Sequence, residues 1–248
     1  SSIILPANLI SIGDGAFNGC SSLSSIILPA NLASISDGAF FICSSLASII
    51  LPANVTSIGD HAFFGCSSLS SIILPANLIS IGDGAFYGCS SLSSITLPAS
   101  VISICNDAFD NCEKLEAITV SSENPNYKSV EGVLFNKDGN KLIKYPSMKN
   151  ETSYSIPANV TFIDNSAFKG CSSLSSIILP PSISSIDDFA FFECGSLLSI
   201  ILPANLASIG NSAFKGCSSL SSIILPPSIS SIGNSVFEGC SSLTSIIL

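Results

Sequence analysis

Residues 67–89 read SSLSSIILPANLISIGDGAFYGC, and residues 44–66 read SSLASIILPANVTSIGDHAFFGC. The same 23-residue phrase recurs along most of the chain, and two residue types mark its period. The periodic residues are Cys20, Cys43, Cys66, Cys89, Cys112, Cys171, Cys194, Cys217 and Cys240, with Pro6, Pro29, Pro52, Pro75, Pro98, Pro157, Pro180, Pro203 and Pro226. A catalytic site is usually built once from unlike residues, whereas a repeated phrase indicates a repeated structural unit.

The first half of each repeat has the pattern of a β-strand. In residues 69–74 the alternation places Ile72 and Leu74 on one face and Ile73 on the other. Pro75 lacks a backbone donor and is expected to end the strand. The strand therefore has one buried and one exposed face.

The second half of each repeat is expected to return to the core. Leu78 and Ile81 point inward, and Asp83 stands where a helix N-cap belongs. We therefore expect one short helical or 3₁₀ turn that delivers Phe86 and Cys89 to the core. A file of Asp and Asn residues at this position also raises calcium as an alternative. One ligand per coil is few for a cation that takes roughly six to eight oxygens, so capping is favoured.

A 23-residue unit cannot bury its apolar face alone, but stacked units can. The period and the leucine spacing predict a leucine-rich-repeat solenoid, an α/β-type repeat fold with a parallel β-sheet on its concave face. Short helical turns and extended segments are expected on the convex side. We expect one continuous solenoid made of regular repeats at 1–119, an irregular repeat or insert at 120–153, and regular repeats at 154–248.

The consensus I-x-LP-x-x-V-x-x-IG-x-x-AF-x-x-C-x-x-L resembles the BspA-like, or Treponema-type, leucine-rich repeats. The resemblance covers nearly the whole chain, and the phrase GVLFNKDG-x-x-LI-x-YP resembles an irregular unit common in that family. It implies a cell-surface or secreted protein of the kind found in mucosal bacteria and anaerobic protists. It also implies adhesion to host matrix proteins or to other cells.

The insert is the least regular part of the chain. Val133–Phe135 and Leu142–Tyr145 flank an Asp-Gly pair, which is a hairpin signal. One interpretation is a variant coil that keeps the stack continuous, and this is favoured. The other is a basic, protruding recognition element. Its candidate contact residues are Lys137, Lys141, Lys144 and Tyr145.

The outward strand positions form a file of β-branched residues. If the alternation holds, they line the concave sheet in water. Contiguous exposed apolar surface often marks a contact site, although β-branched residues also simply suit strands. The candidate binding face comprises Ile27, Ile50, Ile73, Thr96, Thr119, Ile178, Ile201 and Ile224.

Composition excludes several classes of function. The chain of 248 residues has a net charge of −9, eight lysines and no arginine, so nucleic acid is not expected as a partner. No apolar run has the length of a membrane span, and no signal peptide is visible. His61 is the only histidine and no phosphate-binding glycine loop occurs, so we expect no enzyme activity, cofactor or metal.

Nine of the ten cysteines lie in the inward pattern beside phenylalanine, and we expect buried free thiols rather than disulfides. Cys105 replaces the usual glycine and is interpreted as a reactive or paired thiol. Three N-x-[ST] triplets, at Asn54, Asn150 and Asn159, leave glycosylation open.

Two functional hypotheses follow. The first is a non-enzymatic, adhesin-like protein-binding module. The alternative is a structural element that stacks head to tail, because neither end of the chain has a polar cap.

Overall fold

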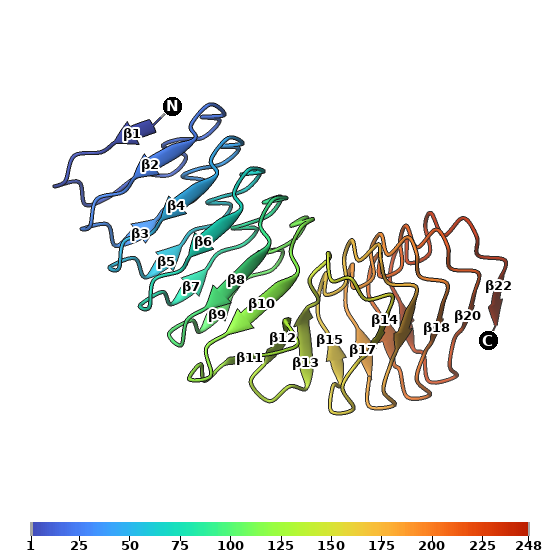
Figure 1. The fold of residues 1–248 in the computed structure, drawn as a ribbon. Coiled ribbons are helices and arrows are strands. Elements are labelled where there is room, and N and C mark those ends of the chain that lie inside the picture. The colour runs from blue at the N-terminus through green and yellow to red at the C-terminus, as the bar shows by residue number, and fades with distance from the viewer. Residues whose placement is uncertain (1, 248) are drawn as a thin grey trace. The chain divides into compact units, whose positions relative to one another are not determined.

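The computed structural model describes residues 2–247, which divide into two compact units, unit 1 up to Gly132 and unit 2 from Val133 (Figure 1). Each unit is a stack of coils, where one coil is one 23-residue repeat. Most coils contribute a strand of three or four residues before the proline and a two-residue strand after it. We call the sheets built from these strands the major and the minor sheet of each unit.

The major strands of unit 1 pair in parallel as β1 with β2, β4 with β6, and β8 with β10. Their bounds are β1 Ser2–Ile4, β2 Ser25–Ile27, β4 Ser48–Ile50, β6 Ser71–Ile73, β8 Ser94–Leu97 and β10 Ala117–Val120. The minor sheet of unit 1 has the order β3-β5-β7-β9. Its strands are β3 Ser34–Ile35, β5 Ser57–Ile58, β7 Ser80–Ile81 and β9 Ser103–Ile104, and β11 follows at Tyr127–Val130.

The major sheet of unit 2 has the order β14-β16-β18-β20-β22. Its strands are β14 Ser153–Ser155, β16 Ser176–Ile178, β18 Ser199–Ile201, β20 Ser222–Ile224 and β22 Ser245–Ile247. In the minor sheet, β12 Val133–Asn136 pairs with β13 Lys141–Lys144, and parallel strands follow. These are β15 Phe162–Ile163, β17 Ser185–Ile186, β19 Ser208–Ile209 and β21 Ser231–Ile232.

Equivalent residues of neighbouring coils lie side by side, as the 23-residue period predicts. In unit 1 Ile50 pairs with Ile73, and in unit 2 Ile201 pairs with Ile224. The minor strands keep the same offset, so Ile58 pairs with Ile81. The expectation of a parallel solenoid of 23-residue repeats is confirmed.

The expectation of a short helical turn is wrong, because no helix is present among residues 2–247. In residues 84–89 the backbone amides alternate between two kinds of partner. The amides of Gly84, Phe86 and Gly88 donate to carbonyls 22 residues later, in the next coil, at 2.8–3.0 Å. The amides between them donate to carbonyls three residues earlier in the same coil, at 3.0–3.3 Å.

Left-handed residues explain why this segment does not continue as a helix. Gly84 has φ 53° and Gly88 has φ 71°, and a right-handed helix requires negative φ at both. Most other coils also have a left-handed residue at these two positions. The segment is therefore a series of β-turns that also forms a hydrogen-bonded ladder between coils.

The core of each unit is a file of stacked aromatic rings. In unit 1 the rings of Phe40, Phe63 and Phe86 are fully buried, and neighbouring centroids lie 5.4 and 5.5 Å apart. In unit 2 the file begins at Tyr145 and continues through Phe168 and Phe191 at 5.2 and 5.1 Å. Because each ring covers the next, the core of a coil is completed only by its neighbours.

The predicted hairpin is present at the start of unit 2. β12 and β13 are antiparallel, with Phe135 opposite Leu142. Asn136 closes the turn, since its Oδ1 accepts the amides of Gly139 and Lys141 at 3.0 Å each. β13 then pairs in parallel with β15, so the second strand of the hairpin also serves as a strand of the minor sheet.

We predict that Phe63→Ala lowers the free energy of unfolding by about 3–5 kcal/mol, because it leaves a cavity between two stacked rings. Phe64→Ala is the matched control, since Phe64 is the next residue in the chain but only half-buried. It should cost less than half as much. Urea unfolding followed by circular dichroism measures both, and equal losses would contradict the importance of the inner file.

Candidate functional site

The outward side of the major sheet, here called the strand face, exposes the predicted isoleucine file. In unit 1 it consists of Ile4, Ile27, Ile50 and Ile73, whose exposed fractions are 78%, 64%, 79% and 77%. Ile49 and Ile72, one residue earlier on the strands, are buried. The period-2 alternation of the sequence therefore places the right residues in water.

The strand face of unit 1 has no charged side chain over its first four coils. The other outward residues of these strands are serines, such as Ser48 and Ser71. Thr96 and Thr119 continue the file in the next two coils, and their hydroxyl oxygens lie 2.7 Å apart. The two threonine hydroxyls bond to each other, so the apolar part of the file ends at Ile73.

A hollow of about 390 Å³ opens on this face between β2 and β4. Its walls include the exposed side chains of Ile27 and Ile50, and Pro52 and Asn54 lie at one side. β2 and β4 belong to separately hydrogen-bonded strand pairs, and the hollow lies where these pairs meet. The hollow is therefore a mainly apolar recess within the isoleucine file.

Unit 2 has its own strand face. Ile178, Ile201 and Ile224 are exposed, and the major strand before them, β14, presents Ser153 and Ser155. Ile201 is 84% exposed. The sequence-predicted face residues are thus all on the surface, although their role in binding remains a prediction.

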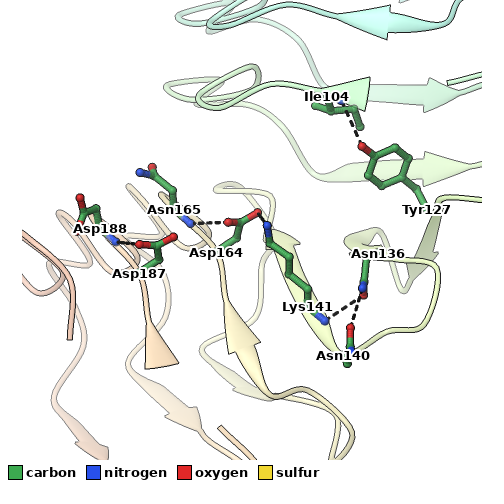
Figure 2. A network of polar contacts seen from close by, with 9 residues as sticks. All are labelled: Ile104, Tyr127, Asn136, Asn140, Lys141, Asp164, Asn165, Asp187 and Asp188. Atoms are coloured by element: carbon green, nitrogen blue, oxygen red, sulfur yellow. Dashed lines mark hydrogen bonds and ion pairs between the residues drawn. The ribbon is translucent and has the colours of Figure 1, made fainter. Parts of the chain in front are cut away.

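The candidate contact residues of the insert are placed differently. Tyr145 is fully buried and Lys144 is 6% exposed, with its Nζ donating to the carbonyl of Ser166 at 2.8 Å. Lys141 forms an ion pair with Asp164 at 2.8 Å (Figure 2). Only Lys137 has an exposed side chain at the hairpin turn. The interpretation of Lys144 and Tyr145 as contact residues is wrong, because neither can reach a partner.

The sequence contained the signal that Tyr145 is a core residue. Tyr145 lies 23 positions before Phe168, so it occupies the position of the buried phenylalanine in its coil. Its hydroxyl donates to Glu151 Oε2 at 3.1 Å, and Lys149 forms an ion pair with the same carboxylate. Burial, followed by the nearby Glu151 charge, raises the pKa of the Tyr145 phenol. Lysines of the insert that looked like a recognition patch therefore anchor the coil.

The file of Asp and Asn residues links neighbouring coils instead of capping a helix. Asp37 Oδ1 accepts the amide of Asp60 at 2.8 Å, and Asp60 Oδ1 accepts the amide of Asp83 at 2.7 Å. In unit 2 Asp188 and Asn211 accept in the same way. The capping expectation is wrong in detail, since each oxygen bonds the equivalent amide 23 residues later.

This side-chain ladder depends on the residue before each donor. The four ladder bonds occur where that residue is Gly59, Gly82, Gly210 or Gly233. A Cβ built on Gly82 would lie 2.5 Å from Asp60 Oδ1 and 2.6 Å from the Asp60 amide nitrogen. A side chain at the glycine position therefore overlaps the ladder acceptor of the coil before.

Coils with a side chain at this position use other contacts. Asp164 and Asp187 each accept the amide of the next residue, at 3.0 and 2.9 Å (Figure 2). The amide of Asp188 is therefore no longer available to Asn165, whose Oδ1 is buried without a hydrogen-bond partner. Cys105 occupies the same position in unit 1 and is exposed.

We predict that Gly82→Cys lowers the free energy of unfolding by about 1–3 kcal/mol, because the added Cβ displaces the Asp60 acceptor. Cys105→Gly is the reciprocal variant. It leaves room for a bond from Asp83 to the Asn106 amide, against a glycine entropy cost of about 0.5–1 kcal/mol. Stability should therefore be unchanged or slightly higher. Thermal unfolding compares them, and a similar loss in both variants would refute the coupling between glycine and ladder.

The periodic cysteines form a file of free thiols inside the core. Cys43, Cys66, Cys89 and the later members are buried, and Cys20 is partly exposed. Cys66 Sγ lies 3.1 Å from the Phe40 carbonyl and donates to it. Burial, with the neighbouring thiol as a second cause, raises the pKa of Cys43 to about 11 and of Cys66 to about 12. These thiols act as small buried groups, whereas Cys105 is a free thiol in water.

The raised pKa values predict a loss of stability in alkali. A thiol whose folded-state pKa exceeds its unfolded value of about 9 stabilises the fold fully below that pH. That stability is lost as the pH rises toward the folded value, by about 1.4 kcal/mol per pH unit for each thiol. The urea midpoint should therefore fall steeply between neutral pH and about pH 10–11. Cys66→Ala should weaken this pH dependence, and an unchanged profile in the parent protein would contradict it.

The remaining candidates for chemistry are isolated. The ring of His61 lies against Phe64 with centroids 5.6 Å apart, and the His61 backbone is left-handed at φ 55°. Among residues 2–247 no group of three His, Cys, Asp or Glu side chains is arranged to hold a metal ion. The same range includes no helix long and apolar enough to cross a membrane.

Stacked parallel coils with one strand per 23-residue repeat define the leucine-rich-repeat class. Within it, the family described as the BspA type leucine rich repeat region matches residues 1–116, 37–149 and 144–248. The chain belongs to this family. Repeats of this class are generally non-enzymatic and serve protein interaction.

Solved structures agree with this assignment. A leucine-rich repeat protein of Eubacterium ventriosum is 26% identical with a TM-score of 0.76, over 91% of this chain and 73% of the other. The pneumococcal vaccine antigen PcpA is 28% identical with a TM-score of 0.83, over 99% and 67%. A leucine rich cell surface protein of Faecalibacterium prausnitzii is 26% identical with a TM-score of 0.58, over 99% and 87%. No curated protein matches the chain.

Proposed function

We propose that this chain is a non-enzymatic, adhesin-like protein-binding module of a cell-surface or secreted protein, and that its strand face is the contact surface. The observation that carries the proposal is the uncharged isoleucine file of unit 1, exposed by 64–79%. The proposed partner is a host matrix protein or a protein of another cell surface.

The size of the apolar file supports this role. Four isoleucines at these exposures present on the order of 400 Å² of apolar surface, the size above which an exposed patch normally marks a contact site. Isolated exposed apolar residues need no such explanation, but these four lie on neighbouring strands of one sheet. Binding that covers them releases ordered water, which is the largest favourable contribution available to this face.

The insert supplies less of the surface than its lysine content indicated. Lys141 and Lys149 are engaged in ion pairs, and Lys144 is buried. We therefore place the contact on the strand faces and give the hairpin a structural role. Lys137, which is exposed at the turn, is the one candidate residue of the insert that we keep for the binding surface.

The similar proteins support the location. One is described as a vaccine antigen and another as a cell surface protein, and both resemble this chain over nearly its full length. A partner outside the cell requires that the module be displayed there. We propose a cell-surface or extracellular location for this chain on that basis.

The proposal predicts that Ile50→Lys combined with Ile73→Lys weakens binding to immobilised matrix proteins, fibronectin and collagen among them, by at least about tenfold. The reason is that a charge in the middle of an apolar contact must be desolvated without a partner. Surface plasmon resonance measures the effect. A combined Ile79→Lys and Ile102→Lys variant is the matched control, since both residues are exposed isoleucines of unit 1 outside the strand face.

The control should bind as the parent protein does. Equal binding by the strand-face variant and the parent protein would remove the strand face from the proposal. Circular dichroism of both variants shows whether a loss of binding reflects a loss of folding.

A further inference from the structure

The strand face of unit 1 has three properties that restrict its partner. The isoleucines repeat at the spacing of parallel strands, about 4.8 Å from one coil to the next. The first four coils present no charge on this face. The recess beside Ile27 and Ile50 is lined mainly by apolar side chains. A partner must therefore be apolar, uncharged and periodic at the same spacing.

We infer that the partner of this face includes a second copy of this chain, packed face to face through the two isoleucine files. This inference rests on the proposed function, because it takes the strand face to be a contact surface. A second copy has the required spacing by construction. Rows of identical side chains on paired sheets interdigitate into dry interfaces with the sheets about 10 Å apart. Each isoleucine of one copy then lies between two of the other.

Charge does not oppose this contact in spite of the net charge of −9. In the first four coils the acidic residues are Asp14, Asp37, Asp60 and Asp83, all in the turn after the minor strands. Two of them accept ladder bonds from the next coil. A partner recognised by charge would find no complementary group on the strand face, whereas a second copy meets no like charge there.

The area agrees with an isologous dimer. Each partner of a standard interface buries about 800 Å², of which roughly 60% is apolar. The four isoleucines supply on the order of 400 Å². The recess at Ile27 and Ile50 has room for an isoleucine side chain of the other copy. The outward serines and the Thr96–Thr119 pair complete the contact with polar surface.

The test uses opposite charges on the same face. The parent chain should sediment at twice its mass of 25.5 kDa in analytical ultracentrifugation at high concentration. Ile50→Lys with Ile73→Lys should be monomeric, because two copies would bring four ammonium groups together. Ile50→Glu with Ile73→Glu should also be monomeric. An equal mixture of the Lys and Glu variants should form a heterodimer, which a folding defect could not produce.

The control with Ile79→Lys and Ile102→Lys should dimerise like the parent chain. A parent chain that stays monomeric at every concentration would overturn the inference. So would a dimer that survives both pairs of substitutions, a mixture that stays monomeric, or species that grow steadily in length by end-to-end stacking. The matrix-protein binding assay is independent, so loss of matrix binding with an intact charge-dependent dimer would reject the proposed function alone.

Discussion

The hydrogen bond from each coil to the next is the constraint on which the rest of the structure depends. In the turn segments alternate backbone amides donate to carbonyls 22 residues later, and in the sheets the strands pair at an offset of 23 residues. A buried backbone group without a partner is costly, so this register admits little slippage. Every other file in the molecule follows from it, because equivalent side chains must then lie over one another.

Inside each unit the consequence is a core made of continuous files. The phenylalanine rings stack at 5.1–5.5 Å in the middle of the files, and the cysteine thiols donate to carbonyls of earlier coils. Outside, the same register exposes one isoleucine per coil on the strand face. A surface of this kind has area and periodicity but few unlike groups close together. It suits broad contact with another apolar surface better than it suits catalysis, which requires a nucleophile, a base and an orienting group in one place.

The irregular positions are explained by the same register. A side chain at the glycine position, such as Cys105 or Asp187, excludes the side-chain ladder bond from the coil before. Asp187 replaces that bond with a contact to its own neighbour, and Asn165 is left with an unpaired oxygen. In the insert, Lys144 and Tyr145 take the places of the alanine and the phenylalanine of a regular coil. An irregular sequence therefore adapts to the stack instead of leaving it.

The repeat period, the strand alternation, the inward files and the exposed isoleucines could all be read from the order of residues, because they depend on spacing alone. The hairpin at Asp138–Gly139 could be read for the same reason. The turn conformation could not, since Asp83 followed by Ala85 and Phe86 satisfies the local rules for a capped helix. Contacts with the next coil overruled them by taking every second amide. The burial of Lys144 was likewise settled by packing, because a lysine is buried only where a carbonyl such as that of Ser166 receives its charge.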